Sequence, residues 1–219
     1  MESRRDFQYY LNEKSVLPQA KYKVPRNRTS KAGRTPTLLN SVILCVDLGQ
    51  YTNNFIMAPT LKHIFTMREY LHPDLAVVGP NYTGATRLMA NVTSGFIKFE
   101  DSGVKADIVP PGGDWPLIDY NANCVHIDAR ARAKTDKGEI YIRYTGMIMI
   151  DEGTKKILDN AAEIKSTNFG DTNWFTRLDV ETTDQSLKWL ETSALVGQGR
   201  WHIDEGGLAA EYLVYKLEN

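Results

Sequence analysis

Hydrophobic and polar residues alternate strictly along the segment from Val125 to Lys134. Its odd-numbered positions are Val, Ile or Ala, and its even-numbered positions are His, Asp, Arg or Lys. This period of two is the signature of a β-strand with one apolar face and one charged face. Turn-forming residues follow at 135–138, and a run of β-branched and aromatic residues then extends from Glu139 to Tyr144. The sequence therefore predicts a central β-hairpin.

Short strand-like segments occur on both sides of this hairpin, separated by Ser, Gly and Asp residues. Their close spacing is typical of an antiparallel meander that closes into a sandwich or a barrel, with about ten strands in all. Besides the hairpin, the expected strands are residues 38–49, 86–92, 95–100, 105–109, 147–150, 174–182, 188–196 and 209–217.

Two segments have helical spacing instead. Residues 154–164 place Ile157, Ala161 and Ile164 on one side, and residues 52–75 carry apolar residues near helical spacing between two prolines. We expect the second segment to be a short helix inserted between strands. It is either a lid or a plug at one end of the domain.

The beginning of the chain differs from the rest. Residues 24–37 are rich in basic and turn-forming residues and poor in apolar ones, which is typical of a linker or an arm. We therefore expect an N-terminal arm over residues 1–37 and one all-β domain over residues 38–219. The positive charges of the arm belong either to a solvated tail or to a contact with a partner subunit, so a homo-oligomer stays open.

Composition and charge narrow the range of partners. The 219 residues carry a formal net charge of −1, with 42% apolar and 24% charged residues. Phosphate backbones and anionic lipid both require a concentrated basic surface, so we expect neither nucleic acid nor a membrane as partner. The sequence has no apolar run of about eighteen residues, and residues 1–14 lack the apolar stretch of a secretory signal. These features predict a cytoplasmic protein.

The motifs of several enzyme classes are missing from the sequence. It contains no GxGxxG after a strand, no GxxxxGK[ST] and no GxSxG, so nucleotide-binding and serine-hydrolase functions have no support. The four histidines are never paired at i, i+2 or i, i+4, which disfavours a metal-binding β-protein. We therefore expect neither a metal nor a cofactor.

Three segments nevertheless resemble a known family. Residues 110–115 (PPGGDW), 128–146 (DARARAKTDKGEIYIRYTG) and 174–200 (WFTRLDVETTDQSLKWLETSALVGQGR) are similar, in order and spacing, to the domain-of-unknown-function family numbered 3237 (DUF3237). The family pattern is approximately PGGaDW, then aRYxLrTdDGalIyVrnrG, then YFRtxxxFETxxxxYxWLnxxlfvgxGxR. The resemblance covers residues 77–217 and implies a closed antiparallel β-barrel of calycin-like appearance.

Two departures from the family pattern bear on the barrel interior. Ala131 replaces the usual aromatic residue, and Tyr144 with Thr145 replaces Asn-Arg. Both exchanges would reshape the interior and with it the choice of substrate.

The resemblance also implies a function. Fungal members similar to this chain occur in aromatic polyketide pathways, where they act as stereoselective cyclases that close an oxygen ring by hydroalkoxylation of a prenyl-type alkene. It therefore implies a cofactor-independent cyclase with a small aromatic substrate. The competing classes are a carrier that binds an aromatic or lipidic ligand unchanged, and a scaffold with a filled barrel.

Candidate site residues are those that carry chemistry within the family-like segments. Arginine forks can hold phenolate oxygens, aromatic faces stabilise cations, and a carboxyl group buried beside an aromatic keeps its proton near neutral pH. Asp114, next to Trp115, is the expected general acid, and Glu181 is the second candidate. The expected substrate-binding residues are Arg87, Trp115, Arg130, Arg132, Tyr141, Arg143, Arg177 and Trp189.

Each candidate also has a purely structural interpretation. The arginines suit exposed ion pairs between strands, the tryptophans suit core packing, and Asp114 suits capping of backbone amides after Gly112-Gly113. If the residues line the interior instead, Arg130 faces the cavity and anchors a substrate oxygen. The expected reaction is then protonation of an alkene, attack of a phenol oxygen on the resulting cation, and loss of the phenolic proton.

Overall fold

The computed structural model describes residues 58–159 and 164–219. The expected arm at 1–37 and the expected strand at 38–49 lie outside these ranges. In chain order the elements are β1 (Thr60–Leu71), β2 (Ala76–Pro80), β3 (Thr86–Phe99), β4 (Lys105–Ile108), β5 (Gly113–Asp114), β6 (Leu117–Asp119), β7 (Cys124–Lys134), β8 (Glu139–Met149), α2 (Glu152–Leu158), β9 (Trp174–Thr182), the 3-10 helix η1 (Gln185–Thr192), β10 (Leu195–Asp204) and β11 (Gly207–Glu218).

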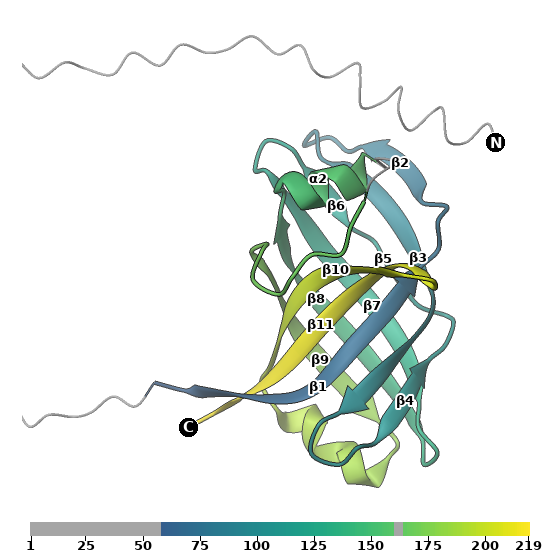
Figure 1. Ribbon diagram of the computed structural model, residues 1–219, viewed down its shortest axis with the longest axis vertical. Helices are drawn as coiled ribbons and strands as arrows, with labels where there is room; N and C mark the ends of the chain where they lie inside the picture. Colours follow the sequence, from purple (N-terminus) through teal and green to yellow (C-terminus); the bar gives the residue numbers. More distant parts are fainter. Residues whose placement is uncertain (1–57, 160–163) are drawn as a thin grey trace, which may run out of the picture.

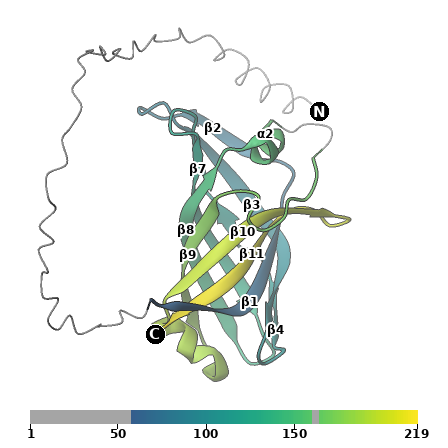
Figure 2. The ribbon, with the colours of Figure 1, turned by 60° about the vertical axis from the view of Figure 1, so that its left-hand side comes forward.

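The described strands form one closed antiparallel barrel (Figure 1). Their order is β1-β11-β10-β9-β8-β7-β4-β3-β2, and the pairing of β1 with β3 closes the ring. The short strands β5 and β6 fill the space between β3 and β7. Strands β1, β11 and β10 lie side by side across one wall (Figure 2). The expected all-β barrel is confirmed.

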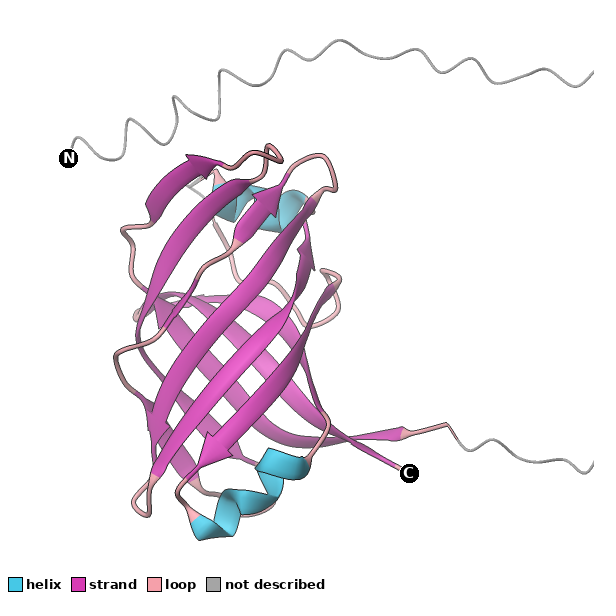
Figure 3. Cartoon of the chain, turned by 180° about the vertical axis from the view of Figure 1, so that it is seen from behind, coloured by secondary structure: helices cyan, strands magenta, loops and turns pink. Residues whose placement is uncertain are grey.

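Two short helices lie at opposite ends of the barrel (Figure 3). Helix η1 buries Leu187 and Leu190 in the hydrophobic core, so it closes its end of the barrel. At the other end, Thr154 of α2 is fully buried and accepts a hydrogen bond from the indole of Trp201 at 3.2 Å. Within residues 58–159 and 164–219, no helix is long and apolar enough to cross a membrane.

The central hairpin is confirmed. Strand β7 buries its Val, Ile and Ala residues and turns its charged residues outward, as the alternation predicts. Strand β8, however, runs on to Met149, so the separate strand expected at 147–150 is the end of β8. Gly146 allows this continuation, because a Cβ atom there would lie 2.1 Å from the backbone oxygen of Phe175 on β9.

The helix expected at 52–75 is wrong for the described part of that segment, which forms strand β1. A β-bulge between His63 and Phe65 places both Ile64 and Phe65 inside the barrel. Because a bulge brings two successive residues to one side, it imitates helical spacing in the sequence. After the bulge, strict alternation resumes and Met67 is buried.

Three further boundaries differ from the sequence-based expectations. Residues 86–99 form one strand instead of two, and residues 185–192 form η1 rather than the beginning of a strand. Asp184 starts η1 by accepting a hydrogen bond from the backbone N–H of Ser186 at 3.0 Å, which is a typical N-cap. Helix α2 begins and ends earlier than expected, and residues 160–163 lie outside the described ranges.

An ion-pair cluster on the outer face joins three neighbouring strands. The buried carboxylate of Glu211 on β11 lies between Arg68 on β1 and Arg200 on β10. One of its oxygens is 2.5 Å from Nη2 of Arg68, and the other is 2.7 Å from Nε of Arg200. Arg68 also reaches Asp204 at 3.0 Å. Two arginine forks around one carboxylate hold the strands in register.

The substitution Glu211→Gln should therefore destabilise the barrel. The amide cannot neutralise two nearby guanidinium groups, so we expect the free energy of unfolding to fall by about 3 kcal/mol, the scale for breaking a buried ion pair. Chemical denaturation measures it. The control is Glu205→Gln in the exposed β10–β11 turn, which should change stability by less than about 0.5 kcal/mol. Equal stability of both variants would contradict a structural role for the cluster.

Candidate active site

Most of the expected substrate-binding residues lie on the outer face of the barrel. On β7 the inward positions are apolar, so Arg130 and Arg132 point outward. Arg130 lies 3.2 Å from Asp128 and over the ring of Trp115, and Arg132 binds Glu139 through two nitrogens at 2.9 and 3.0 Å. The expectation that Arg130 faces the cavity is therefore wrong, because the strand register places it on the solvent side.

The same applies to the candidates on β8 and β9. Tyr141, Arg143 and Arg177 are all exposed on the outer face. Arg177 pairs with Asp179 at 2.6 Å rather than with Glu181. Glu181 is itself exposed, so its carboxyl group points into solvent and not into the barrel.

Three remaining candidates also lie outside the interior. Trp115 is 38% exposed, and Trp189 on η1 is 40% exposed. Arg87 donates a hydrogen bond to the backbone oxygen of Trp115. These residues therefore cannot contact a ligand held within the barrel.

Asp114, by contrast, points into the barrel. It lies opposite Ala90 on β3 and Ala129 on β7, and both of these alanines face the interior. Burial raises the pKa of Asp114 to about 6, although a hydrogen bond from the backbone N–H of Asp128 to its Oδ1, at 3.0 Å, opposes the rise. The barrel wall rather than Trp115 supplies this burial, since the indole lies on the other side of the sheet.

A second carboxyl group, Glu69 on β1, lies deeper in the same interior and is only 1% exposed. It sits opposite Ala210 on β11, whose small side chain leaves room for it. The hydroxyl of Tyr144 donates a hydrogen bond to Oε2, while Oε1 has no hydrogen-bond partner among the described residues. Burial raises the pKa of Glu69 to about 7.

Aromatic rings surround the two carboxyl groups. Tyr144 contacts Tyr212 edge to face at 5.3 Å, Tyr212 contacts Trp174 at 5.4 Å, and Trp174 contacts Trp201 at 4.6 Å between ring centroids. Burial and the nearby carboxylates raise the pKa of both tyrosines well above the usual range, so they act as hydrogen-bond donors and not as bases. Packed aromatic side chains therefore surround the two carboxyl groups in the interior.

Two glycines of strand β10, in the GQGR segment at residues 197–200, leave space for these side chains. A Cβ atom on Gly199 would lie 2.4 Å from the indole ring of Trp174, and one on Gly197 would lie 2.6 Å from the hydroxyl of Thr176. The Thr176 hydroxyl is buried and has no partner among the described residues. Buried polar groups without a partner are costly, so the free oxygens of Thr176 and Glu69 favour a bound molecule that would satisfy them.

The charge of one interior carboxyl group acts on the other. After the effect of burial, the charge of Asp114 further raises the pKa of Glu69. Because burial raises both pKa values, each of these carboxyl groups keeps a proton to a higher pH than an ordinary carboxyl group does. With one of them protonated and the other ionised, they would supply a proton donor and a proton acceptor.

Sequence reasoning found Asp114 but missed Glu69 and its hydrogen-bond partner Tyr144. Glu69 was hidden because residues 52–75 suggested a helix. The usable signal was the alternation of Phe65, Met67 and Glu69, which puts an acid on the apolar side of a strand.

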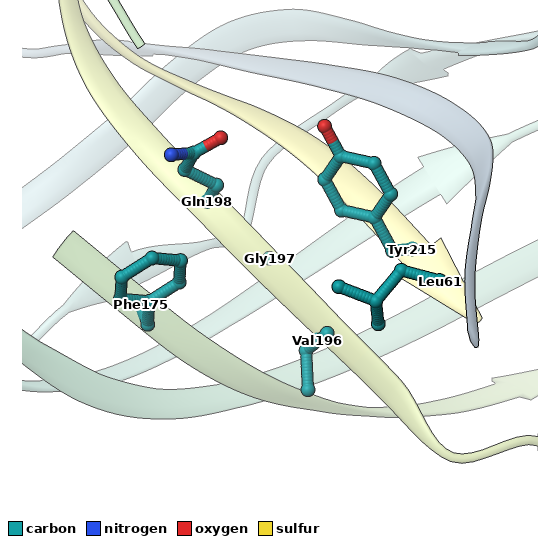
Figure 4. A pocket seen from close by; sticks show the side chains of 6 residues that line it. All are labelled: Leu61, Phe175, Val196, Gly197, Gln198 and Tyr215. Carbon is teal, nitrogen blue, oxygen red and sulfur yellow. The ribbon is translucent and has the colours of Figure 1, made fainter. Parts of the chain in front are cut away.

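The outer face carries a shallow apolar pocket of about 290 Å³ (Figure 4). Phe175 of β9, Tyr215 of β11 and Leu61 of β1 border it. On β9 and β11 the buried residues alternate with Phe175 and Tyr215, so these two side chains point away from the interior. The pocket contains no ionisable acid. Within residues 58–159 and 164–219, no cluster of three His, Cys, Asp or Glu side chains is placed to hold a metal ion.

The structure thus defines a closed β-barrel with a pair of carboxyl groups inside it. The family model described as a protein of unknown function (DUF3237) matches residues 59–217, and the chain belongs to this family.

The chain is also similar to a protein of a fungal biosynthesis cluster. The chain is 27% identical over 114 residues to PR-toxin biosynthesis cluster protein 7 of Penicillium roqueforti, a match that covers 51% of this chain and 60% of that relative. The chain therefore spans less than two thirds of the relative's length.

Two solved structures share the fold. A conserved protein of unknown function from Rhodopseudomonas palustris has a TM-score of 0.61 at 20% identity, covering 74% of this chain and 99% of the other. A β-barrel-like protein from Acinetobacter baumannii has a TM-score of 0.56 at 22% identity, covering 77% and 100%.

The buried acid should make stability depend on pH. Because the pKa of Glu69 rises from 4.5 to about 7 on folding, the folded state binds more protons in this window, and the stabilisation is lost as pH rises. Between pH 4.5 and pH 8 we expect the wild type to lose about 3 kcal/mol relative to Glu69→Gln.

Urea denaturation across this pH range measures the difference. The exposed Glu100→Gln should follow the wild-type profile at every pH. Parallel profiles for the wild type and Glu69→Gln would show that Glu69 ionises normally in the folded protein.

Proposed function

We propose that this protein is a cofactor-independent cyclase of secondary metabolism, which closes an oxygen heterocycle by stereoselective intramolecular hydroalkoxylation of a prenylated aromatic polyketide. The observation that carries the proposal is the pair of inward-pointing carboxyl groups of Asp114, which is partly buried, and Glu69, which is buried, with pKa values raised to about 6 and about 7. The kinship with a PR-toxin biosynthesis cluster protein of Penicillium roqueforti supports a biosynthetic role.

Burial and hydrogen bonding suggest how the roles divide. Glu69 is 1% exposed and its Oε1 has no hydrogen-bond partner among the described residues, which favours the protonated form. Asp114 is only partly buried, and the N–H group of Asp128 stabilises its carboxylate. We therefore assign the donor role to Glu69 and the acceptor role to Asp114. From the sequence alone we expected Asp114 to be the proton donor. In the proposal it remains in the site but acts as the proton acceptor.

The reaction would begin with proton transfer from Oε1 of Glu69, the oxygen that has no hydrogen-bond partner among the described residues. The π electrons of the prenyl alkene form the new C–H bond and leave a tertiary cation. The phenol oxygen then forms the C–O bond, and its proton passes to Asp114. Return of one proton from Asp114 to Glu69 restores the site, so the net reaction is an isomerisation.

The surrounding residues would support each step. Tyr144 donates to Oε2 of Glu69 and so stabilises the carboxylate that forms. The faces of Trp174 and Tyr212 can stabilise the passing cation. Exclusion of water protects the cation from hydration, and the barrel wall folds the flexible prenyl chain toward the attacking oxygen.

Turnover of prenylated polyphenols by the purified protein tests this proposal. We expect an optically enriched cyclic ether, detected by chiral chromatography, without any added cofactor. Glu69→Gln and Asp114→Asn should each lower kcat by about 10²- to 10⁴-fold, the usual scale of acid–base catalysis, while ligand binding is retained. The rate should pass through a maximum between about pH 6 and about pH 7, since one carboxyl must be protonated and the other ionised.

Glu181→Gln is the matched control, because it removes an exposed carboxyl group from the outer face. Its turnover should equal that of the wild type. Full turnover in a folded Glu69→Gln or Asp114→Asn variant would refute the assignment. Ligand binding without any turnover by the wild type would identify a carrier instead.

A further inference from the structure

A second pocket lies at the end of the barrel that η1 covers. Its volume is about 540 Å³, and Ile64, Phe99 and Leu187 form an apolar floor. Each of these three side chains is at most 5% exposed, so the pocket reaches down to the hydrophobic core. Its lining residue on β1 nearest to Glu69 is Ile64, five residues away, which is about 16 Å at the usual rise per residue. The pocket is therefore separate from the carboxyl pair.

Lysines from three different elements line this pocket. Lys62 comes from β1, Lys137 from the β7–β8 turn and Lys216 from β11. Asp101 and Glu218 are the two carboxylates among the lining residues, so the pocket has one positive charge in excess. An anionic ligand would meet a favourable field there.

The ion pairs already present would not prevent binding of an anion. Lys62 lies 2.6 Å from Asp101, and Lys216 lies 3.2 Å from Glu218. The side chains of Lys62 and Asp101 are 48% and 72% exposed, and water weakens such exposed ion pairs. The lysines can therefore turn toward a ligand at low cost.

One wall of the pocket is aromatic. Trp189 of η1 is 40% exposed, and Nζ of Lys216 lies 5.8 Å from the centroid of its ring. An exposed indole above an apolar floor offers a flat surface on which another ring can stack. The lysine beside it would meet a charged group carried by that ring.

We propose that this pocket binds a small aromatic anion, with its ring between Trp189 and the apolar floor and its carboxylate or sulfonate among Lys62, Lys137 and Lys216. A neutral aromatic of the same shape gains the stacking but not the charge, so it binds more weakly. The proposal rests on different residues from the cyclase site and stands independently of that activity.

Isothermal titration of the full chain with 2-naphthoate and with neutral 2-naphthalenemethanol tests the site. We expect naphthoate to bind about tenfold more tightly than the alcohol at low salt and to lose this advantage at high salt. Trp189→Ala should weaken naphthoate binding about tenfold, and Lys137→Gln about fivefold.

Two controls separate this site from other surfaces. Trp115→Ala removes another partly exposed tryptophan, on the outer face, and should leave naphthoate binding unchanged. Glu69→Gln should also leave it unchanged, even where that variant has lost turnover. Equal affinity for the alcohol, full binding by both Trp189→Ala and Lys137→Gln, or absence of binding at millimolar naphthoate would each overturn the proposal. Loss of binding in Glu69→Gln would assign the ligand to the barrel interior instead.

Discussion

The closed barrel depends on one constraint, which is that every strand must keep a single register with both of its neighbours. In a closed ring, alternate residues face a dry interior and the others face water. Once β7 turns its alanines inward, its pairing with β5 fixes Asp114 inside and Trp115 outside. The pairing of β1 with β11 fixes Glu69 inside in the same way. The chemistry of the site follows from this register.

Burying two carboxyl groups in such an interior has a clear energetic cost. Each group must either keep its proton or find hydrogen bonds for its charge. Glu69 receives one hydrogen bond from Tyr144, and Asp114 receives one from the backbone of Asp128. This support is incomplete, because Oε1 of Glu69 has no partner among the described residues. An interior that served only stability would be better filled with apolar side chains, so the pair favours a catalytic role.

The sequence predicted the barrel, the central hairpin and one member of the carboxyl pair. The hairpin was predictable because the alternation from Val125 to Lys134 is unbroken. The expected substrate-binding residues lie outside the interior for a different reason. The same alternation that identifies a strand does not say which polar residues face a ligand, and here the charged face of β7 is the outer face.

Glu69 was missed because a local irregularity concealed its strand. The bulge after His63 places two successive apolar residues inside, and this spacing imitates a helix. Its hydrogen bond to Tyr144 joins residues 75 positions apart, which no local pattern can reveal. The closed ring as a whole determines which distant strands pair. This pairing in turn determines which residues meet in the site.

A carbon-13 NMR titration of the Asp and Glu carboxyl groups in the wild-type protein tests most directly whether Glu69 and Asp114 have raised pKa values inside the barrel. Resonances assigned by their loss in Glu69→Gln and Asp114→Asn should titrate with midpoints of about 7 and about 6. Midpoints near the ordinary carboxyl value of about 4 for both groups would mean that neither keeps its proton at neutral pH, and would contradict the account.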